Sequence, residues 1–311
     1  MTTTFKLNTG AQIPAVGFGT WQDAEAQEQA VLEAIKAGYR HIDTARIYGT
    51  EEAVGKAIKK SGVPRNQLFI TTKLWNNKHH PDDVAQALQD SLNDLDLEYV
   101  DLFLMHWPVA FKRGTEKFPK NESGKPAVED TDYVDTYKAM EKLLSTGKVK
   151  AIGVSNFSKS EMERLLQNSS VVPAVHQLES HPWLQQRSFA DWHKSKGIHV
   201  THYSPFGNQN ELYSREGTIG KLIDDPVLVE IGKKYNKSSA QVALAWGINE
   251  GHSVLPKSKT PSRIRDNLQG DFKLDAEDLQ KIRGIDRKLR FNDSSADFGR
   301  EFFGDLDGKQ K

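Results

Sequence analysis

Residues 68–106 read LFITTKLWNNKHHPDDVAQALQDSLNDLDLEYVDLFLMH, and they predict a β-strand, a helix and a second β-strand in that order. Leu68–Lys73 is short and rich in apolar and β-branched residues, as strands are. The helix is expected after Pro81, a residue suited to a first helical turn. Val100–Met105 is a nearly continuous apolar run, typical of a buried strand. Two strands joined through a helix lie parallel, so this stretch predicts a βαβ unit.

The same alternation of strand and helix continues along the chain. It is typical of a parallel sheet covered by helices, and eight such units in about 250 residues favour closure into a (β/α)8 TIM barrel over an open sheet. An N-terminal β-hairpin is expected before the first unit, and no change of composition marks a linker, so residues 1–311 are predicted to form one domain. The predicted strands are 16–18, 40–42, 68–73, 100–105, 149–154, 172–176, 198–203 and 253–255. The predicted helices are 24–37, 52–60, the one after 81, 133–144, 160–167, 188–196, 226–235 and 239–249.

The composition argues against several classes of function. Lys and Arg number 42 and Asp and Glu number 42 among the 311 residues, so the formal net charge is zero. Such a chain lacks the positive field that attracts nucleic acid or anionic membranes, so neither partner is expected. The absence of cysteine excludes disulfides, thiolate nucleophiles and cysteine-ligated metals. Without a spanning apolar run of roughly 18 residues or an N-terminal secretory pattern, a cytoplasmic monomer acting on a small molecule is expected.

Two predicted connections are longer than usual, Val109–Asp130 after the fourth strand and Phe206–Asp225 after the seventh. Long connections in a compact domain are usually either functional or disordered. Both follow a strand, which places them at the carboxyl-terminal face of a barrel, where active sites lie. They are interpreted as candidate substrate lids, and surface loops without a role are the alternative.

Polar side chains end three successive predicted strands. Asp43 ends the second strand, Lys73 the third and His106 the fourth, and Tyr48 follows five residues after Asp43. Each of them alone has a structural explanation, such as a turn cap or a buried histidine. Because all strand ends of a barrel meet at one mouth, the four side chains are expected to converge.

Together these groups suit proton transfer to a carbonyl oxygen. A lysine cation about 4 Å from the phenol of Tyr48 would contribute about 4 kcal/mol at an effective dielectric constant near 20, or roughly three pKa units. This upper estimate predicts a pKa near 7 for Tyr48, and the countercharge of Asp43 makes the shift smaller. His106 would orient the carbonyl oxygen. The set contains no nucleophile, so the hydride has to come from a cofactor. The chain has neither a glycine-rich dinucleotide fingerprint nor a Walker A loop, so a nucleotide cofactor would have to bind without them.

Three longer motifs resemble the signatures of the aldo-keto reductases. They are GYRHIDTARIYGTEEAVG at 38–55, KAIGVSNF at 150–157 and LPKSKTPSRIRDNL at 255–268. They stand in the family's order and span nearly the whole chain. The resemblance implies an (α/β)8 barrel, NAD(P)H-dependent carbonyl reduction and no metal, with a catalytic tetrad of Asp43, Tyr48, Lys73 and His106.

The resemblance also implies the cofactor contacts. It places Gly19, Thr20, Trp21 and Asp43 near the nicotinamide, Ser155, Asn156 and Gln177 on its carboxamide, Tyr203 against the ring, and Ser204 and Pro205 at the start of the loop over the pyrophosphate. At the adenosine end it places Lys257, Ser258, Thr260, Arg263 and Asn267. Two cations and two hydroxyls in this second group suit a 2′-phosphate, so NADPH is predicted over NADH.

The resemblance further implies a substrate pocket walled by Trp21, Tyr48, His106 and Trp107. The tail at 298–305 is polar with two adjacent aromatic residues, which suits a small hydroxylated aldehyde better than a steroid. The chain is also similar to the fungal glycerol dehydrogenase and glyceraldehyde reductase branch of the family. The predicted reaction is therefore NADPH-dependent reduction of glyceraldehyde or aldoses, reversible toward glycerol or other polyols.

Four alternatives stay open at this point. An aldolase could form a Schiff base on Lys73, although the neighbouring Asp43 favours the charged amine. A metal-dependent hydrolase would need clustered histidines, whereas His79 and His80 are predicted in a loop. A retaining glycosidase could use Asp43 and Glu179, which leaves Lys73 unexplained. A regulatory subunit could bind NADPH on the same barrel without turnover.

Overall fold

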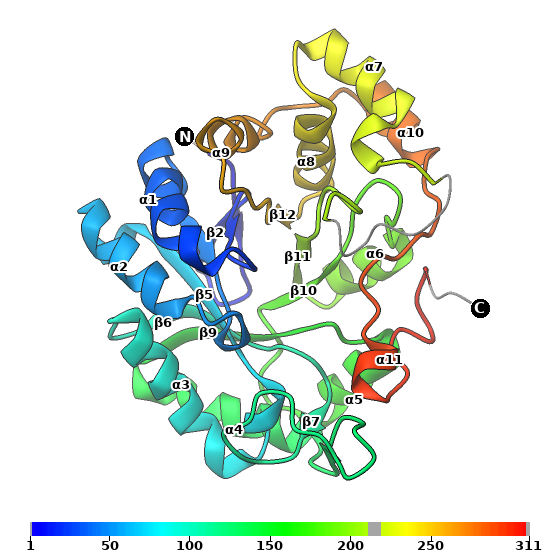
Figure 1. Cartoon of the computed structure of the whole chain (residues 1–311). Coiled ribbons are helices and arrows are strands. Elements are labelled where there is room, and N and C mark those ends of the chain that lie inside the picture. The colour runs from blue at the N-terminus through cyan, green and yellow to red at the C-terminus, as the bar shows by residue number, and fades with distance from the viewer. Residues whose placement is uncertain (1, 211–218, 309–311) are drawn as a thin grey trace.

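In the computed structural model, which describes residues 2–210 and 219–308, eight parallel strands form a barrel (Figure 1). Their order is β12-β11-β10-β9-β6-β5-β4-β3. A parallel bridge between Val16 and Val254 joins the two ends of this sheet, and the Gly17 amide donates to the Val254 carbonyl at 2.9 Å. The predicted (β/α)8 fold is therefore confirmed. The strands are β3 (Phe18–Gly19), β4 (His41–Asp43), β5 (Phe69–Leu74), β6 (Val100–Met105), β9 (Val149–Ser155), β10 (Val175–Glu179), β11 (His199–Tyr203) and β12 (Ser253–Val254).

Helices surround the barrel (Figure 1), and several begin or end at the residues that local chemistry favours. Gly38 follows α1 with a φ of 116°, a left-handed conformation that glycine adopts most easily. Ser158 and Glu161 form a reciprocal capping box at the start of α5. The short helices α9 to α11 were not among the predicted elements. The helices are α1 (Gln27–Ala37), α2 (Glu51–Ser61), α3 (Pro81–Leu95), α4 (Tyr133–Leu143), α5 (Lys159–Asn168), α6 (Arg187–Ser195), α7 (Pro226–Tyr235), α8 (Ser239–Asn249), α9 (Pro261–Leu268), α10 (Ala276–Arg283) and α11 (Ser295–Phe298).

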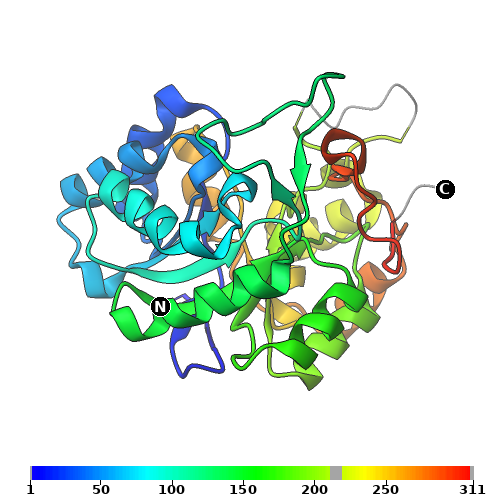
Figure 2. The ribbon, with the colours of Figure 1, turned by 90° about the horizontal axis from the view of Figure 1, so that it is seen from below.

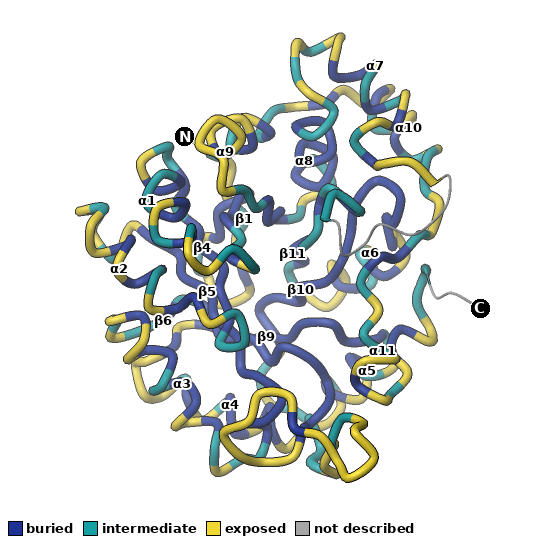
Figure 3. The backbone as a smooth tube through the Cα atoms, viewed as in Figure 1, coloured by how far each residue is buried: buried dark blue, intermediate teal, exposed yellow. Residues whose placement is uncertain are grey.

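The strands and the inner faces of the helices are buried, whereas the outer faces of the helices are exposed (Figure 3). All six residues of β5 are buried, which explains why apolar and polar residues do not alternate along its sequence. Lys73 belongs to this buried strand, with 1% of its surface exposed. A buried cation requires a partner, so its position already indicates a specific site.

The two ends of the barrel differ (Figure 2). The predicted N-terminal hairpin, β1 (Thr4–Lys6) with β2 (Gln12–Pro14), lies at one end. The first long connection lies at the other end, as does α11. This connection contains an antiparallel pair of its own, β7 (Ala110–Phe111) with β8 (Val128–Glu129). Of the second long connection, residues 211–218 lie outside the described residues, so its proposed role as a lid stays a prediction.

The strand β10 begins three residues later than predicted. The pattern predicts a strand over 172–176, whereas β10 runs from Val175 to Glu179. Pro173 has no amide hydrogen for a ladder bond, and Val172 is 42% exposed. The carbonyls of both residues instead accept hydrogen bonds from the Asn8 side chain, at 3.4 and 3.2 Å, in the turn of the hairpin. The later end of β10 matters because Glu179 becomes the last residue of the strand.

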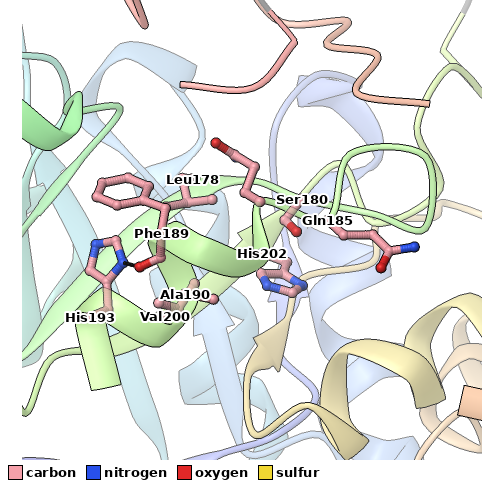
Figure 4. Close-up of a pocket in the computed structure, with 9 residues that line it drawn as sticks. Leu178, Ser180, Gln185, Phe189, Ala190, His193, Val200 and His202 are labelled. Carbon is pink, nitrogen blue, oxygen red and sulfur yellow. Dashed lines mark hydrogen bonds between the residues drawn. The ribbon is translucent and has the colours of Figure 1, made fainter. Parts of the chain in front are cut away.

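Figure 4 shows how α6 packs on the neighbouring strands. Phe189 and Ala190 of the helix face Leu178 and Val200, and the Phe189 carbonyl bonds to the ring of His193 at 2.6 Å. The space between these side chains has no room for a water molecule, so it belongs to the packed layer between helix and sheet. No helix in the described ranges is long and apolar enough to cross a membrane.

Candidate active site

Asp43, Tyr48 and Lys73 meet at the carboxyl ends of β4 and β5. The Lys73 Nζ donates to the Asp43 Oδ1 at 2.5 Å and to the Thr44 carbonyl at 2.9 Å. It lies 3.5 Å from the Tyr48 Oη. Asp43 and Lys73 are almost fully buried, at 3% and 1% exposure, so the ion pair has little contact with water. The structure therefore brings a buried cation against the phenol, as the order of the strand ends predicts.

His106 and Gln177 complete this group of side chains. The His106 ring lies edge-on to the Tyr48 ring, with 5.8 Å between the centroids. The Gln177 Nε2 donates to the second carboxylate oxygen of Asp43 at 2.7 Å. Both oxygens of Asp43 therefore have donors, which fixes the carboxylate that holds Lys73.

The predicted pKa of Tyr48 near 7 is wrong in this structure. Burial, the largest cause, raises the pKa of the phenol, and the Lys73 cation lowers it while Asp43 raises it again, so the pKa lies above its usual value. The sequence estimate assigned too little to burial and to the countercharge, because neither can be read from residue order. For Lys73, burial opposes the charge, but Asp43 and Tyr48 outweigh it, so its pKa is raised and the amine stays protonated.

The imidazole of His106 is neutral. Burial is the main cause that places its pKa well below 6.5, and the charge of Lys73 lowers it further. The Asn156 side chain donates to the His106 carbonyl at 3.0 Å, and the ring of Trp75 lies 5.2 Å away, edge-on. A neutral imidazole held in this way still donates one ring hydrogen, which suits a carbonyl oxygen.

The residues assigned to the nicotinamide lie beside this group. Asn156 has a φ of 63° and accepts a hydrogen bond from the Tyr203 hydroxyl at 2.6 Å, while its amide also bonds to Ser155 at 3.1 Å. The Thr20 hydroxyl donates to the Asp43 carbonyl at 3.0 Å. The Gly19 amide donates to the Pro256 carbonyl at 3.0 Å, so this glycine belongs to the closure of the barrel. Ser204 follows with a φ of 48°, and Pro205 after it is buried.

The residues assigned to the adenosine end lie around the start of α9. Lys257 forms an ion pair with Asp23, and the Lys259 Nζ lies 3.0 Å from the other oxygen of the same carboxylate. The Ser258 hydroxyl accepts from the Thr260 amide at 3.1 Å. Further along the helix, Arg263 is exposed and Asn267 is 8% exposed. Asp23 is a partner of Lys257 that the sequence pattern did not reveal.

An aromatic wall stands next to His106. Trp107 of the predicted pocket packs edge-on against two rings of the C-terminal segment, with centroid distances of 5.2 and 5.1 Å, and Trp21 is 38% exposed. Trp75 and Phe111 of this wall were missed in the sequence, although Trp75 stands only two residues after Lys73. We call this cluster the aromatic wall; its members are Trp75, Trp107, Phe111, Phe298, Phe302 and Phe303.

The described ranges, 2–210 and 219–308, contain no group of three or more His, Asp and Glu side chains that could hold a metal ion. Glu179, the second carboxylate of the glycosidase alternative, accepts hydrogen bonds from the amides of Phe291 and Asn292 at 2.9 and 2.7 Å. Asp43 is held by Lys73 and Gln177. Neither carboxylate is arranged as a free acid or nucleophile.

The chain is similar to known proteins along almost its whole length. Residues 15–287 match the model of the aldo/keto reductase family. An uncharacterized oxidoreductase of Schizosaccharomyces pombe is 46% identical over 98% of this chain and 95% of its own. Aldo-keto reductase family 1 member A1 of Xenopus tropicalis is 46% identical over 92% of this chain and 89% of its own. The aldose reductase of Schistosoma japonicum superposes with a TM-score of 0.89 at 33% identity, over 97% of this chain and 98% of its own. This chain therefore belongs to the aldo/keto reductase family.

Proposed function

We propose that this protein is an NADPH-dependent reductase of small hydroxylated aldehydes such as glyceraldehyde and aldoses, and that the reaction is reversible toward glycerol and other polyols. Membership of the family makes it an oxidoreductase, and the family generally uses NAD(P)H. The observation that carries the proposal is the contact at 3.5 Å between the Tyr48 hydroxyl and the buried Lys73 ammonium, beside His106.

Tyr48 is the proposed proton donor to the carbonyl oxygen. Its raised pKa keeps the phenol protonated at neutral pH. The alkoxide that forms in a reduction is a base comparable to hydroxide, whose conjugate acid, water, has a pKa of about 15.7, so the phenol remains the stronger acid. Lys73 stabilises the negative charge that develops on the phenol oxygen as the proton leaves. Proton transfer from Tyr48 therefore does not require a pKa near 7.

His106 is proposed to orient the substrate carbonyl. The neutral imidazole can donate one hydrogen bond to the carbonyl oxygen without competing with Tyr48 as an acid. The Asn156 side chain holds the backbone at His106, and the rings of Tyr48 and Trp75 limit the movement of the imidazole. The carbonyl would then lie between the two donors.

A nicotinamide dinucleotide fits the remaining residues. When bound, it supplies the hydride of the reduction. The polar atoms of Ser155, Asn156 and Gln177 form a hydrogen-bonding surface next to the phenol, with the Tyr203 ring beside it. At the other end, two lysines meet at Asp23. We propose that the 2′-phosphate of NADPH takes the place of this carboxylate on Lys257, since both are anions.

The substrate proposal draws on a wall of closely packed rings. The centroid of the Phe298 ring lies 5.2 Å from that of Trp107 and 5.0 Å from that of Phe111, edge-on in both pairs, and this close packing favours a small carbonyl compound over a wide steroid. The polar residues of the tail give a small hydroxylated aldehyde less support than the sequence analysis expects. Arg300 is paired with Glu161 and lies 5.5 Å from the centroid of the Phe302 ring, and Asp305 accepts from backbone amides at the start of α5, so both are engaged by other residues of the protein.

The main test follows NADPH absorbance with glyceraldehyde, aldoses and bulky ketones, with NADH in parallel. Tyr48→Phe should abolish reduction and leave NADPH binding, measured by fluorescence titration, nearly unchanged. Full activity of Tyr48→Phe would remove the phenol from the chemistry. Turnover of bulky ketones without turnover of glyceraldehyde would refute the substrate class. Lys257→Met should reduce the preference for NADPH over NADH in kcat/KM, and an unchanged preference would refute the phosphate assignment.

Two alternatives remain, the aldolase and the regulatory subunit, and experiments on the same wild-type protein distinguish them from the proposed reductase. An aldolase needs a neutral amine at Lys73, whereas Asp43 and Tyr48 outweigh burial and raise its pKa. Borohydride added with an aldehyde would trap an adduct at Lys73 itself only if this alternative were correct. A subunit that binds NADPH without catalysis would show the binding signal of the wild-type protein and no loss of NADPH absorbance with any aldehyde.

A further inference from the structure

The C-terminal segment supplies half of the aromatic wall. Phe298, Phe302 and Phe303 come from this segment and pack on Trp107, with centroid distances from 5.1 to 6.1 Å. Trp107 follows His106 directly in the chain. The position of the segment therefore sets the shape of the space in front of His106, and the groups that hold the segment act on substrate binding from a distance.

Glu179 holds the start of this segment. It is the last residue of β10 and is fully buried. Its Oε1 accepts from the Phe291 amide at 2.9 Å and its Oε2 from the Asn292 amide at 2.7 Å. The ring of His181 lies 3.0 Å from Oε1. A carboxylate in this position has no place in the proton transfer, so its burial needs another explanation.

The surroundings of Glu179 keep it ionised. Burial raises its pKa, but the hydrogen bond and charge of His181, the Arg290 cation and the Phe291 amide outweigh burial, so that its pKa lies below the usual value. Hydrogen bonds from backbone amides to a carboxylate are stronger than those to a neutral acceptor. The two hydrogen bonds to the backbone are therefore strong. They join a rigid barrel strand to Phe291 and Asn292, which lie 112 and 113 positions after Glu179 in the chain.

Arg290 forms a second connection at the same place. Arg290 is 1% exposed, and its guanidinium donates to the Gln186 side chain at 3.1 Å and to the Asp307 carbonyl at 3.0 Å. Gln186 in turn donates to the Glu179 carbonyl at 2.7 Å. The guanidinium also lies 4.0 Å from the centroid of the Phe303 ring. Arg290 thus connects the end of β10 to a ring of the aromatic wall.

The same segment contacts the residues assigned to the cofactor. The Asn292 Nδ2 donates to the Ser204 Oγ at 3.3 Å, at the start of the loop after β11. Glu179 stands two residues after Gln177 on β10, and alternate residues of a strand point to the same side. One strand therefore carries both the residue that bonds to Asp43 and the residue that holds the C-terminal segment.

We propose that Glu179 is a positioning residue for the carbonyl substrate: it fixes residues 290–292 against the end of β10, and thereby sets the aromatic wall over Trp107 before the substrate binds. This inference rests on the proposed carbonyl reductase function. Glu179 acts on KM rather than on the chemical step, because it touches neither Tyr48 nor Lys73. The far end of the segment has an anchor of its own, since Asp305 accepts from the Lys159 and Ser160 amides at 3.3 and 2.7 Å.

The test compares Glu179→Gln with Asp305→Asn in the full chain. In Glu179→Gln an amide donor faces one of the two backbone amides, so one hydrogen bond to a charged group is lost. We expect about a tenfold rise in KM for glyceraldehyde, which is equivalent to about 1.4 kcal/mol. The kcat value and the NADPH dissociation constant should change by less than about threefold, the effect of at most one weak hydrogen bond. Hydrogen exchange should increase at 290–303 in Glu179→Gln, and only near 300–306 in Asp305→Asn.

Unchanged KM together with unchanged exchange at 290–303 would overturn the inference, as would a loss confined to kcat. If Glu179→Gln does not fold, Arg290→Met carries the test, with the same rise in KM and in exchange expected. A wild-type protein that reduces no aldehyde would refute the proposed function, and the exchange measurement would still decide whether Glu179 holds the segment.

Discussion

Replacing Lys73 by methionine removes the cation next to Tyr48 and tests the electrostatic argument directly. Two unit charges 3.5 Å apart interact with about 4.7 kcal/mol at an effective dielectric constant near 20. Only part of a negative charge has developed on the phenol oxygen when the proton is half transferred, so about half of this energy, roughly 2.4 kcal/mol, acts on the barrier. This corresponds to about a 50-fold loss in kcat/KM.

The countercharge of Asp43 does not reduce this loss. Asp43 lies 2.5 Å from the Lys73 Nζ and its negative charge remains in the variant, so the field at the phenol changes by the contribution of the removed cation alone. We therefore expect a decrease in kcat/KM of about 50-fold. The assay is the initial rate of NADPH oxidation with glyceraldehyde, measured over a range of substrate concentrations at neutral pH.

A loss of folding has to be separated from this effect. Lys73→Met leaves the buried Asp43 without its cation, and breaking a buried pair in this way costs about 3–5 kcal/mol of stability. The matched control is the double variant with Asp43→Asn, which has no buried charge at either position. It should regain most of the thermal stability without regaining activity. A single variant within about threefold of wild-type kcat/KM, or a double variant with restored activity, would refute the role of the cation.

Two further predictions follow from the same structure. The pH profile of kcat/KM for reduction should be flat from about pH 6.5 upward and fall only above about pH 10. The reason is that the raised pKa of Tyr48 keeps the proton donor protonated and that His106 stays neutral throughout. A decrease in kcat/KM that begins near pH 7 would show that the phenol is far more acidic. Gly55→Ala should lower the free energy of unfolding by roughly 1–3 kcal/mol, the typical cost of overpacking. The reason is that a Cβ at this position would lie 2.2 Å from the Leu95 carbonyl oxygen. An unchanged midpoint of thermal unfolding would contradict this packing.

The sequence is sufficient to predict that Asp43, Lys73 and His106 converge. Parallel strands place their carboxyl ends at one mouth, so the order of strand ends predicts proximity without any distance. The start of β10 was harder to predict, because valines 171 and 172 have high strand propensity while Pro173 removes a ladder bond. Such competition is decided by contacts with the hairpin, which lie far away in the chain.

The anchor at Glu179 could not be predicted for a related reason. Its partners are backbone amides of Phe291 and Asn292, and a backbone amide leaves no signal in residue type. The pKa of Tyr48 was predicted in the wrong direction because its sign depends on the balance between burial and two opposite charges. Residue order predicts which charges are neighbours, whereas depth of burial appears only in the folded structure.

The balance of these charges also bears on the direction of the reaction. Lys73 and Asp43 form a pair without net charge, so the field at the phenol is weaker than that of a lone cation. Reduction needs a protonated phenol, which a raised pKa provides at neutral pH, whereas oxidation of an alcohol needs the deprotonated phenol as a base. Raising the pH increases the fraction of that base and decreases the fraction of the donor. In the proposed mechanism the neutral pair therefore makes carbonyl reduction faster near pH 7 and alcohol oxidation faster at alkaline pH, which is the pH dependence that the proposed reversibility requires.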